Sequence, residues 1–356
     1  MGGGAAMSEP GTSTGSGARG NTAGNAAAGN AAAGNGAGPG GSAPESPAQL
    51  DRGSWLAAGK RAAKEFSNDF LQDRSAALTY YGVLAIFPAL LVLVSLLGLI
   101  GKSATQPLIT NLAQAAPSAV RQTLLTAVDH LQHSHGSAGL VAVIGIAAGL
   151  WSASSYIAAF MRASNAIYDV PEGRPAWKTL PIRLGVTIVM MVLLIAAAFI
   201  VLVTGGLARH VGQVLGIGSV ALTVWNIAKW PVLLLIVSLM LAILYWASPN
   251  AKQGFRWLSP GSIIAVLGWL VASGLFALYV ANFGHYNKVY GSIAAIIIFL
   301  IWMWISNSVV LFGAEFNAEL QRGRAIAAGL PPEKEPFAEL RDTRKLRKKS
   351  RRKLRA

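Results

Sequence analysis

The feature that most constrains this chain is a series of long apolar stretches bounded by charged residues. The first runs from Tyr81 to Gly101 and has no ionisable side chain except that of Tyr81. A helix of this length, at about 1.5 Å per residue, covers the hydrocarbon core of a bilayer, which is about 30 Å thick. The stretch therefore predicts a membrane-spanning helix.

Composition supports the same class of protein. Hydrophobic residues make up 53% of the 356 residues and charged residues only 13%, whereas about a quarter of the residues in a soluble domain are charged. The chain has no cysteine, which excludes disulfides, thiolate catalysis, iron–sulfur clusters and zinc sites that need sulfur.

Five further apolar stretches follow the first. They predict an all-α, polytopic integral membrane protein with a membrane domain at 54–324 and six transmembrane helices. The predicted spans are 81–101, 140–161, 184–207, 230–248, 260–281 and 289–314. Residues 106–131, in the longest outer loop, predict one or two further helices.

The placement of basic residues predicts the topology. With six spans and both termini in the cytoplasm, most of the 30 Lys and Arg residues lie inside, as expected from the positive-inside rule. The apolar segment 211–228 could be counted as a seventh crossing, but the basic C-terminus would then lie outside. We therefore interpret 211–228 as an outer interfacial or re-entrant segment.

The two ends of the chain differ from the middle. Residues 1–50, rich in Gly, Ala and Asn, predict a disordered cytoplasmic tail. Residues 325–356 predict a basic cytoplasmic tail attracted to anionic lipid headgroups; the alternative partner for these charges is nucleic acid.

A charged, amphipathic segment precedes the first span. Residues 54–79 predict an interfacial helix, with aromatic rings at headgroup level and basic residues near lipid phosphates. Glu65, Asp69 and Asp73 recur at a spacing of four and share one face, so they repel one another unless a cation lies among them.

The ionisable groups near the span ends are the first candidate site. We expect a polar ring around a cytoplasmic opening, with Arg74 paired to Glu315 or Asp73. The alternative is a set of ion pairs that only fix the helix ends. The members of the predicted ring are Asp69, Asp73, Arg74, Asp169, Glu315 and Asn317.

Few polar residues lie inside the predicted spans. The cluster Ser306, Asn307 and Ser308 is a second candidate, because an amide in mid-membrane needs a hydrogen-bonding partner. His130, His133 and His135 have the only metal-like spacing, but only Asp129 lies near them as a further ligand. The sequence therefore predicts no metal, no cofactor and no catalytic group.

Three segments resemble the YihY/BrkB family of bacterial inner-membrane proteins. They are RSAALTYYGVLAIFPALL at 74–91, SYIAAFMRASNAIYDVPEGRPAWK at 155–178, and the segment 286–320, which ends in GAEFNAEL. The positions that carry the resemblance are Tyr80, Tyr81, Phe87, Pro88, Asn165, Tyr290, Gly291 and Gly313.

The resemblance implies a six-helix protein of the bacterial plasma membrane with cytoplasmic termini. It does not supply an activity, although some members carry a ribonuclease label. The sequence predicts a non-enzymatic protein that binds or transports a small or lipid-like solute, or maintains the envelope, and it leaves an oligomer open. The alternative is a membrane-anchored ribonuclease or RNA-binding protein that uses the basic tail.

Overall fold

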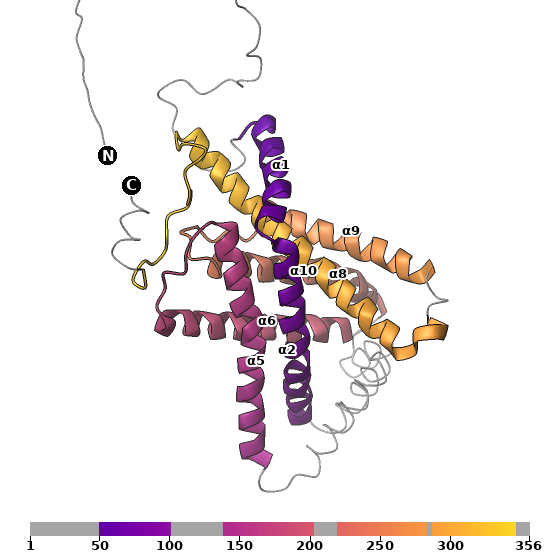
Figure 1. The fold of residues 1–356 in the computed structure, drawn as a ribbon. Coiled ribbons are helices and arrows are strands. Elements are labelled where there is room, and N and C mark those ends of the chain that lie inside the picture. Colours follow the sequence, from indigo (N-terminus) through magenta and orange to yellow (C-terminus); the bar gives the residue numbers. More distant parts are fainter. Residues whose placement is uncertain (1–49, 101–137, 203–218, 283–286, 347–356) are drawn as a thin grey trace, which may run out of the picture. The chain divides into compact units, whose positions relative to one another are not determined.

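The computed structural model describes residues 50–100, 138–202, 219–282 and 287–346. These ranges are helical apart from residues 50–51, the connections at 69–70, 168–175 and 248–259 and the C-terminal stretch 328–346 (Figure 1). One isolated β-bridge joins Ala251 and Leu340. The described helices are α1 (Arg52–Asn68), α2 (Leu71–Ile100), α5 (Ala138–Ile167), α6 (Ala176–Leu202), α8 (Ser219–Ala247), α9 (Pro260–Asn282) and α10 (Asn287–Ala327). Side chains at 87–100, 138–146, 202, 219–222, 282 and 287–292 are not described. The predicted all-α class is confirmed for the described part.

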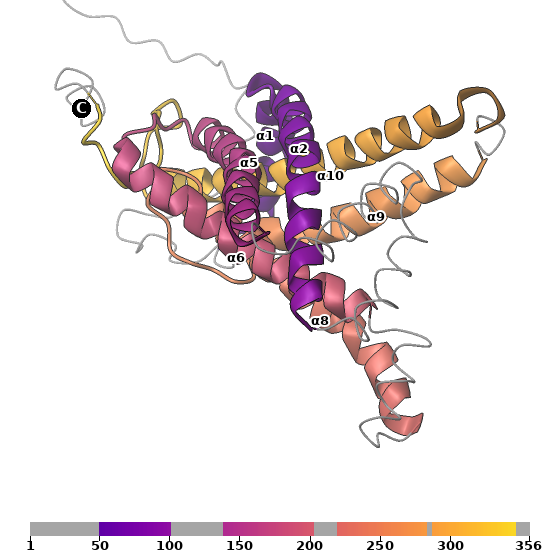
Figure 2. The ribbon, with the colours of Figure 1, turned by 90° about the horizontal axis from the view of Figure 1, so that it is seen from below.

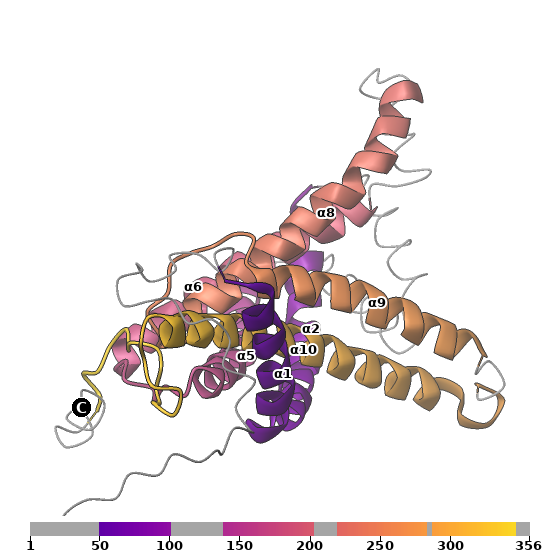
Figure 3. The same ribbon diagram turned by 90° about the horizontal axis from the view of Figure 1, so that it is seen from above.

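Most of the described helices pack against more than one neighbour, and α10 contacts α1, α2 and α9. α2 packs against α5, α6 packs against both α5 and α8, and α9 packs against α10. Figures 2 and 3 show α9 and α10 side by side. α9 and α10 come close at Gly261 and Gly313, where a Cβ atom on either glycine would collide with the carbonyl oxygen of the other. Gly313, one of the family-like positions, therefore lets two helices approach closely.

Four helices within the described part are long and apolar enough to cross a membrane. They are Ala176–Val201, Thr223–Ala247, Pro260–Ala281 and Ile293–Ala327. Large apolar side chains such as Val192, Leu267 and Leu275 lie exposed on them, as expected where lipid replaces water. α2 and α5 have 30 residues each, so their length also allows a crossing, but six spans remain a prediction.

The predicted interfacial helix at 54–79 is wrong in its extent. α1 ends at Asn68, Phe70 has a positive φ of 52°, and the next helix begins at Leu71 and continues into the first predicted span. Ser75 and Thr79 do not interrupt α2, because their hydroxyls donate to the carbonyls of Leu71 and Ser75.

α1 packs on the C-terminal half of α10. Ala58 and Ala62 are buried there against Phe316 and Leu320. Their small side chains let the helices approach closely. α1 is therefore held by protein contacts as well as by any contact with the membrane surface.

The predicted separate segment 211–228 is also wrong for its described part. α8 runs without a break from Ser219 to Ala247, so residues 219–228 belong to the same helix as the span at 230–248. Lys229 does not end the helix, because its amine reaches the side chain of Asn226 at 3.2 Å and lies over the ring of Trp230.

The predicted boundary between membrane domain and basic tail, at 324/325, is wrong as well. α10 continues to Ala327, and the chain then returns to the α8–α9 loop, where Arg341 donates its N–H to the carbonyl of Asn250 at 2.7 Å. We call 328–346 the return segment. It packs because Phe337 and Leu340 contact the buried core. The predictions for 1–49, 106–131, the three histidines and 347–356 lie outside the described residues.

Candidate functional site

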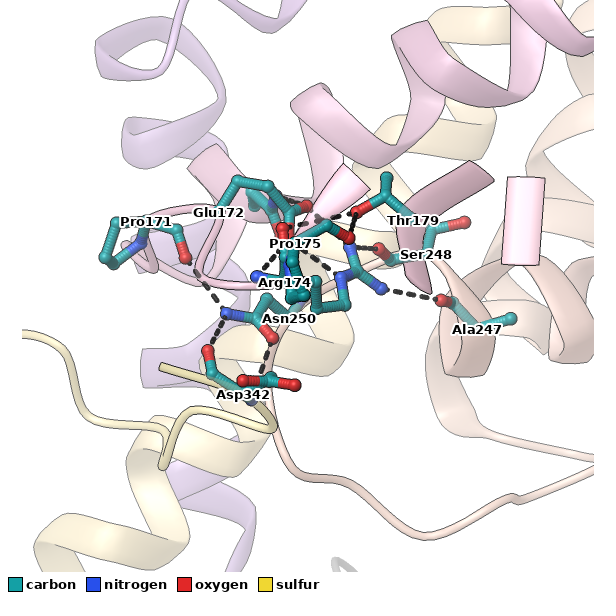
Figure 4. A network of polar contacts seen from close by, with 10 residues as sticks. Pro171, Glu172, Arg174, Pro175, Thr179, Ala247, Ser248, Asn250 and Asp342 are labelled. Atoms are coloured by element: carbon teal, nitrogen blue, oxygen red, sulfur yellow. Dashed lines mark hydrogen bonds and ion pairs between the residues drawn. The ribbon is translucent and has the colours of Figure 1, made fainter. Parts of the chain in front are cut away.

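Three connections meet at one end of the helices: the α5–α6 loop, the α8–α9 loop and the return segment. Arg174 of the first loop is 2% exposed and donates to both carboxylate oxygens of Glu172, at 2.8 and 2.7 Å (Figure 4). It also donates to the carbonyls of Ser248 and Ala247, at 2.8 and 3.4 Å, just after and at the end of α8. A buried guanidinium thus ties two loops together.

The pKa of Glu172 reflects this pairing. Burial would raise its pKa, but hydrogen bonds and charge from Arg174, with the amide of Asn165 at 3.0 Å, outweigh burial and hold the pKa below its usual value. The carboxylate therefore stays ionised beside its partner.

Asn250 connects the same loops to the return segment. Its side chain donates to the carbonyls of Pro171 and Asp342 and accepts from the N–H of Asp342 (Figure 4). Its own N–H donates to Asn165 at 2.7 Å. Asn165, a family-like position, thus bridges Glu172 and Asn250, and Lys178 adds an ion pair to Asp342 at 2.7 Å. We call these contacts the Arg174 network.

A group of carboxyls from four parts of the chain lies beside α10. Three members of the predicted ring come together there, since the charges of Asp69 and Asp169 both act on Glu315. We call the whole group the acidic cluster: Glu65, Asp69, Asp169, Glu315, Glu319 and Glu335.

Two arginines pair with the outer members of this cluster. Arg61 of α1 donates to Glu319. Arg322 lies 3.7 Å from Glu319 and 3.3 Å from Glu335. These pairs satisfy Glu319 and Glu335 but not Glu315.

The predicted pairing of Arg74 is wrong. Its Nε donates to the carbonyl of Asp69 at 2.9 Å, not to Glu315 or Asp73. The helix break at Phe70 leaves that carbonyl, at the end of α1, available to Arg74. Asp73 is exposed on α2.

Glu315 is the member of the acidic cluster whose charge is least compensated by partners among the described residues. Its side chain is 1% exposed, and within the described part of the chain its buried Oε2 has no hydrogen-bond partner. A buried carboxylate without a partner is costly, so such a group favours its neutral form.

Asp69 and Asp169, which lie between helices, have shifted pKa values. Burial raises the pKa of Asp69 to about 6, with Glu65 adding to the effect and Arg74 opposing it. Burial, together with the charges of Glu335 and Asp69, raises the pKa of Asp169 to about 7. The acidic cluster therefore holds protons near neutral pH more readily than isolated carboxyls do.

A cavity of about 270 Å³ lies between the α8–α9 loop, α8, α10 and the end of α5. We call it the basic cavity, because its charged lining side chains are Lys252, Arg256 and Arg324 and no described acidic residue lines it. Gln253 and Gln321 add amides. Such a lining suits an anion.

Hydrogen bonds fix the walls of the basic cavity. Tyr168 donates its hydroxyl to Gln253 at 2.9 Å, and Gln253 donates to the carbonyl of Tyr245. Asn317 accepts from the N–H of Gly261 and donates to Ser259, both at 2.8 Å. Asn317, predicted in the polar ring, thus belongs to this wall and anchors the start of α9.

The predicted cluster at 306–308 points in three directions. Asn307 accepts from the hydroxyl of Tyr156 at 2.9 Å and donates to Thr79 at 3.1 Å, so it joins α10 to α5 and α2. Ser306 accepts from Trp269 of α9, and Ser308 donates to its own helix at Trp304. The amide has the partners that its burial requires, but the three residues do not form one site.

A second cavity, of about 320 Å³, is almost wholly apolar. It lies between α2, α5, α6 and α8, and Gly82, Met190, Met240 and Leu244 are among its lining residues. We call it the apolar cavity; flexible methionines suit a variable apolar ligand.

Of the remaining family-like positions, the structure describes the side chains of two tyrosines. Tyr80 is exposed and meets Tyr81 edge to face, while Tyr81 lies under the guanidinium of Arg162 at 5.9 Å. Phe87 and Pro88 lie in α2, and Tyr290 and Gly291 in α10, but their side chains are outside the described ones.

Several functional candidates were missed from sequence. Arg256, Arg324 and Gln253 carry no motif, and Asn250 and Asp342 meet only because the return segment folds back. The available signal was the position of Arg256 just before an apolar stretch and of Arg324 just after one, which places them at the same end of their helices.

The apolar helices and the charged loop end define a helical membrane protein. The chain belongs to the family described as virulence factor BrkB, whose profile matches residues 62–337. This confirms the family resemblance.

Curated relatives agree with this assignment. The putative ribonuclease-like protein YfkH of Bacillus subtilis (strain 168) is 30% identical over 266 residues, which cover 75% of this chain and 94% of YfkH. UPF0761 membrane proteins of Alkalilimnicola ehrlichii and Chromohalobacter salexigens are each 30% identical, over 79% and 78% of this chain and 64% and 68% of their own lengths. No solved structure matches.

Proposed function

We propose that this protein is a non-enzymatic, six-span protein of the bacterial plasma membrane, with cytoplasmic termini, that binds an anionic solute in the basic cavity. The solute is small or lipid-like, and its binding serves transport or maintenance of the envelope. The observation that carries the proposal is the basic cavity itself, with three cationic side chains and no described acidic one in its lining.

The chemistry of the lining favours an anion with two or more oxygens. A guanidinium presents a planar fork that matches a carboxylate or phosphate group. Arg256 comes from the α8–α9 loop and Arg324 from α10, so an anion between them would hold two elements together. Lys252 contributes less, because Glu339 lies 2.9 Å from its amine.

The apolar cavity supports the lipid-like version of the proposal. Among its described lining residues only Tyr156 and Thr187 carry a side-chain hydroxyl. An acyl chain would lie there without leaving a polar group unsatisfied. The basic run at 347–356 is also suited to anionic headgroups.

The positive-inside rule supports a cytoplasmic location for the basic cavity, since Lys252, Arg256 and Arg324 lie at one end of α8, α9 and α10. A cysteine placed at exposed Gly254 should react with an impermeant maleimide only in inverted membrane vesicles. Labelling in right-side-out vesicles would place the cavity outside and contradict this topology.

Binding is tested on the full chain in nanodiscs of zwitterionic lipid. We expect sulfate to bind by calorimetry, and Arg256→Gln and Arg324→Gln each to weaken it about tenfold, since a charge-assisted hydrogen bond contributes about 1.5–3 kcal/mol. Lys229→Gln, which removes one positive charge outside the cavity lining, is the matched control. Unchanged affinity in both arginine variants would sink the proposal.

A second arm separates a lipid headgroup from a soluble anion. Native mass spectrometry would compare retention of phosphatidylglycerol by the wild type and by Leu244→Trp, which fills the apolar cavity. Loss of lipid with sulfate affinity unchanged favours a lipid-like solute, whereas unchanged lipid retention favours a small one.

The alternative is a membrane-anchored ribonuclease or RNA-binding protein. It is favoured by the ribonuclease-like name of YfkH and by the basic run after Leu346. Truncation after Leu346 removes that run and keeps the return segment. Salt-sensitive RNA binding that disappears on truncation would support the alternative; no RNA binding in the full chain would remove it.

A further inference from the structure

Glu315 is a buried carboxyl that the proposed anion site does not use. It lies on α10, two residues before Asn317 of the basic cavity, and is 1% exposed. Within the described part of the chain no ion pair reaches it, and its Oε2 lies buried without a hydrogen-bond partner.

Charged side chains lie near Glu315, but the nearby arginines pair with other groups and do not compensate its charge. Arg61 and Arg322 pair with Glu319, Arg322 also with Glu335, and Arg74 donates to a backbone carbonyl. The titratable and charged groups that face this region are Arg61 and Glu65 of α1, Asp69 and Arg74 around the α1–α2 break, Tyr168 and Asp169 after α5, Glu319, Arg322 and Arg324 of α10, and Glu335 of the return segment.

This arrangement favours a neutral Glu315. Ionisation would place a negative charge in a water-poor site, among carboxyls and without a cation of its own. In the described residues no three His, Asp or Glu side chains are arranged to hold a metal ion. The ligand that the site suits is therefore a proton.

We propose that Glu315 is a proton-binding site coupled to anion binding in the basic cavity. The coupling half of this inference rests on the proposed function, whereas the proton half rests on Glu315 alone. The two halves have separate measurements.

Tyr168 provides the connection between the two sites. Its side chain lines the basic cavity, and its hydroxyl donates to Gln253 in the cavity wall. Burial raises the pKa of Tyr168, and the charge of an ionised Glu315 would raise it further, so the protonation state of Glu315 acts on this wall. An ionised Glu315 would repel an anion in the cavity, and a protonated one would not.

The coupling must be reciprocal. If protonation of Glu315 strengthens anion binding, anion binding strengthens protonation by the same factor. The anion and the proton then bind together, so a protein that moves this solute would move a proton in the same direction.

The proton half is tested by infrared spectroscopy of the full chain in nanodiscs at pH 8, where Asp69 and Asp169 are mostly ionised. We expect the carbonyl band of a protonated carboxyl in the wild type, its loss in Glu315→Gln and its retention in Glu333→Gln, which changes an exposed glutamate. The same protonated-carboxyl band in the wild type and Glu315→Gln, or no such band in either, would show an ionised Glu315 and overturn the proposal.

The coupling half is tested with sulfate, whose charge is constant between pH 5 and 9. We expect the wild-type affinity to be at least threefold higher at pH values where the Glu315 infrared band is present than where it is lost, and Glu315→Gln to keep the higher affinity throughout. Asp169→Asn is the control for neighbouring carboxyls and should keep the difference.

The two halves fail in different ways. The same difference in Glu315→Gln would overturn the coupling. No sulfate binding at any pH would contradict the proposed function, and with it the coupling, while the infrared band would still decide whether Glu315 binds a proton.

Discussion

Arg174 and Glu315 are both fully buried ionisable side chains near the same end of the helices, but their surroundings are opposite. Arg174 has a bidentate carboxylate partner and two backbone carbonyls. Glu315 has neighbouring carboxyls, and its Oε2 has no hydrogen-bond partner among the described residues. The Arg174 network satisfies its charge, whereas the acidic cluster leaves one group without compensation.

This difference separates a structural role from a functional one. A buried charge with all its partners fixes the positions of the loops that provide them. A buried acid without partners costs stability and is a candidate for proton binding or transport. The comparison predicts that similar substitutions will have opposite effects in the two regions.

The largest expected effect is that of Arg174→Met. The substitution leaves the Glu172 carboxylate half-buried without its partner and frees the carbonyl of Ser248, so it should cost about 3–5 kcal/mol. Thermal unfolding in detergent, with size-exclusion chromatography, should show a strongly lowered melting temperature or aggregation. Lys345→Met, at an exposed site in the return segment, is the control and should leave the melting temperature unchanged.

A direct comparison is the same change, Glu to Gln, in each region. Glu172→Gln should lower stability by about 1.5–3 kcal/mol, because a charge-assisted pair becomes a neutral one. Glu315→Gln should leave stability unchanged or raise it, because the neutral carboxyl and the amide have similar shapes. An equal loss in both variants would mean that Glu315 is an ionised, paired group, and the contrast would disappear.

Much of the fold could be read from the sequence, because apolar length and charge placement determine where helices can span. The helix ends could not. Asp69 and Phe70 form a break in a segment that has a continuous helical pattern, and Lys229 looks like a boundary but lies inside α8. Lys229 is accommodated by Asn226 and Trp230 of its own helix, and Arg74 donates to the Asp69 carbonyl at the break; the spacing of charged and apolar residues reveals neither contact.

The sequence predicts the residues of the acidic cluster only in part, because charge placement indicates which carboxyls lie near the ends of the spans but not how they pair. The charges of Asp69 and Asp169 act on Glu315, although Glu315 lies inside α10 and not at its end; that these residues form a ring around an opening stays a prediction. Their pairing could not be predicted, because Glu319 takes Arg61 from a helix 258 residues away in sequence. The return segment belongs to the stretch 325–356 that the sequence predicts as a basic cytoplasmic tail, because its charge hides the few apolar contacts of Phe337 and Leu340.

A smaller effect is expected at Asp169, which lies at the edge of the acidic cluster. Its pKa of about 7 is above the value of 3.8 for an isolated Asp. Between these two pH values the folded state binds more protons than the unfolded state. The contribution of Asp169 to the free energy of unfolding is therefore fully present below pH 4 and is lost as pH rises to about 7.

Asp169→Asn should remove that pH dependence. Asn accepts the positive φ of 51° at this position. Because the side chain is partly exposed and solvent screens its charge, we expect a gain of only a few degrees in melting temperature at pH 8 and none at pH 4. An equal gain at both pH values would assign the effect to something other than ionisation.

The smallest effect is expected for Lys252→Gln. The Lys252–Glu339 pair has a short distance of 2.9 Å, but its two side chains are 63% and 78% exposed, so water already solvates both charges and the pair adds little stability. The melting temperature should not change, and sulfate affinity should fall less than in Arg256→Gln because Glu339 offsets the Lys252 charge. A loss of stability comparable with that of Arg174→Met would mean that burial and partner count do not separate the structural charges from the others, and the comparison would have to be abandoned.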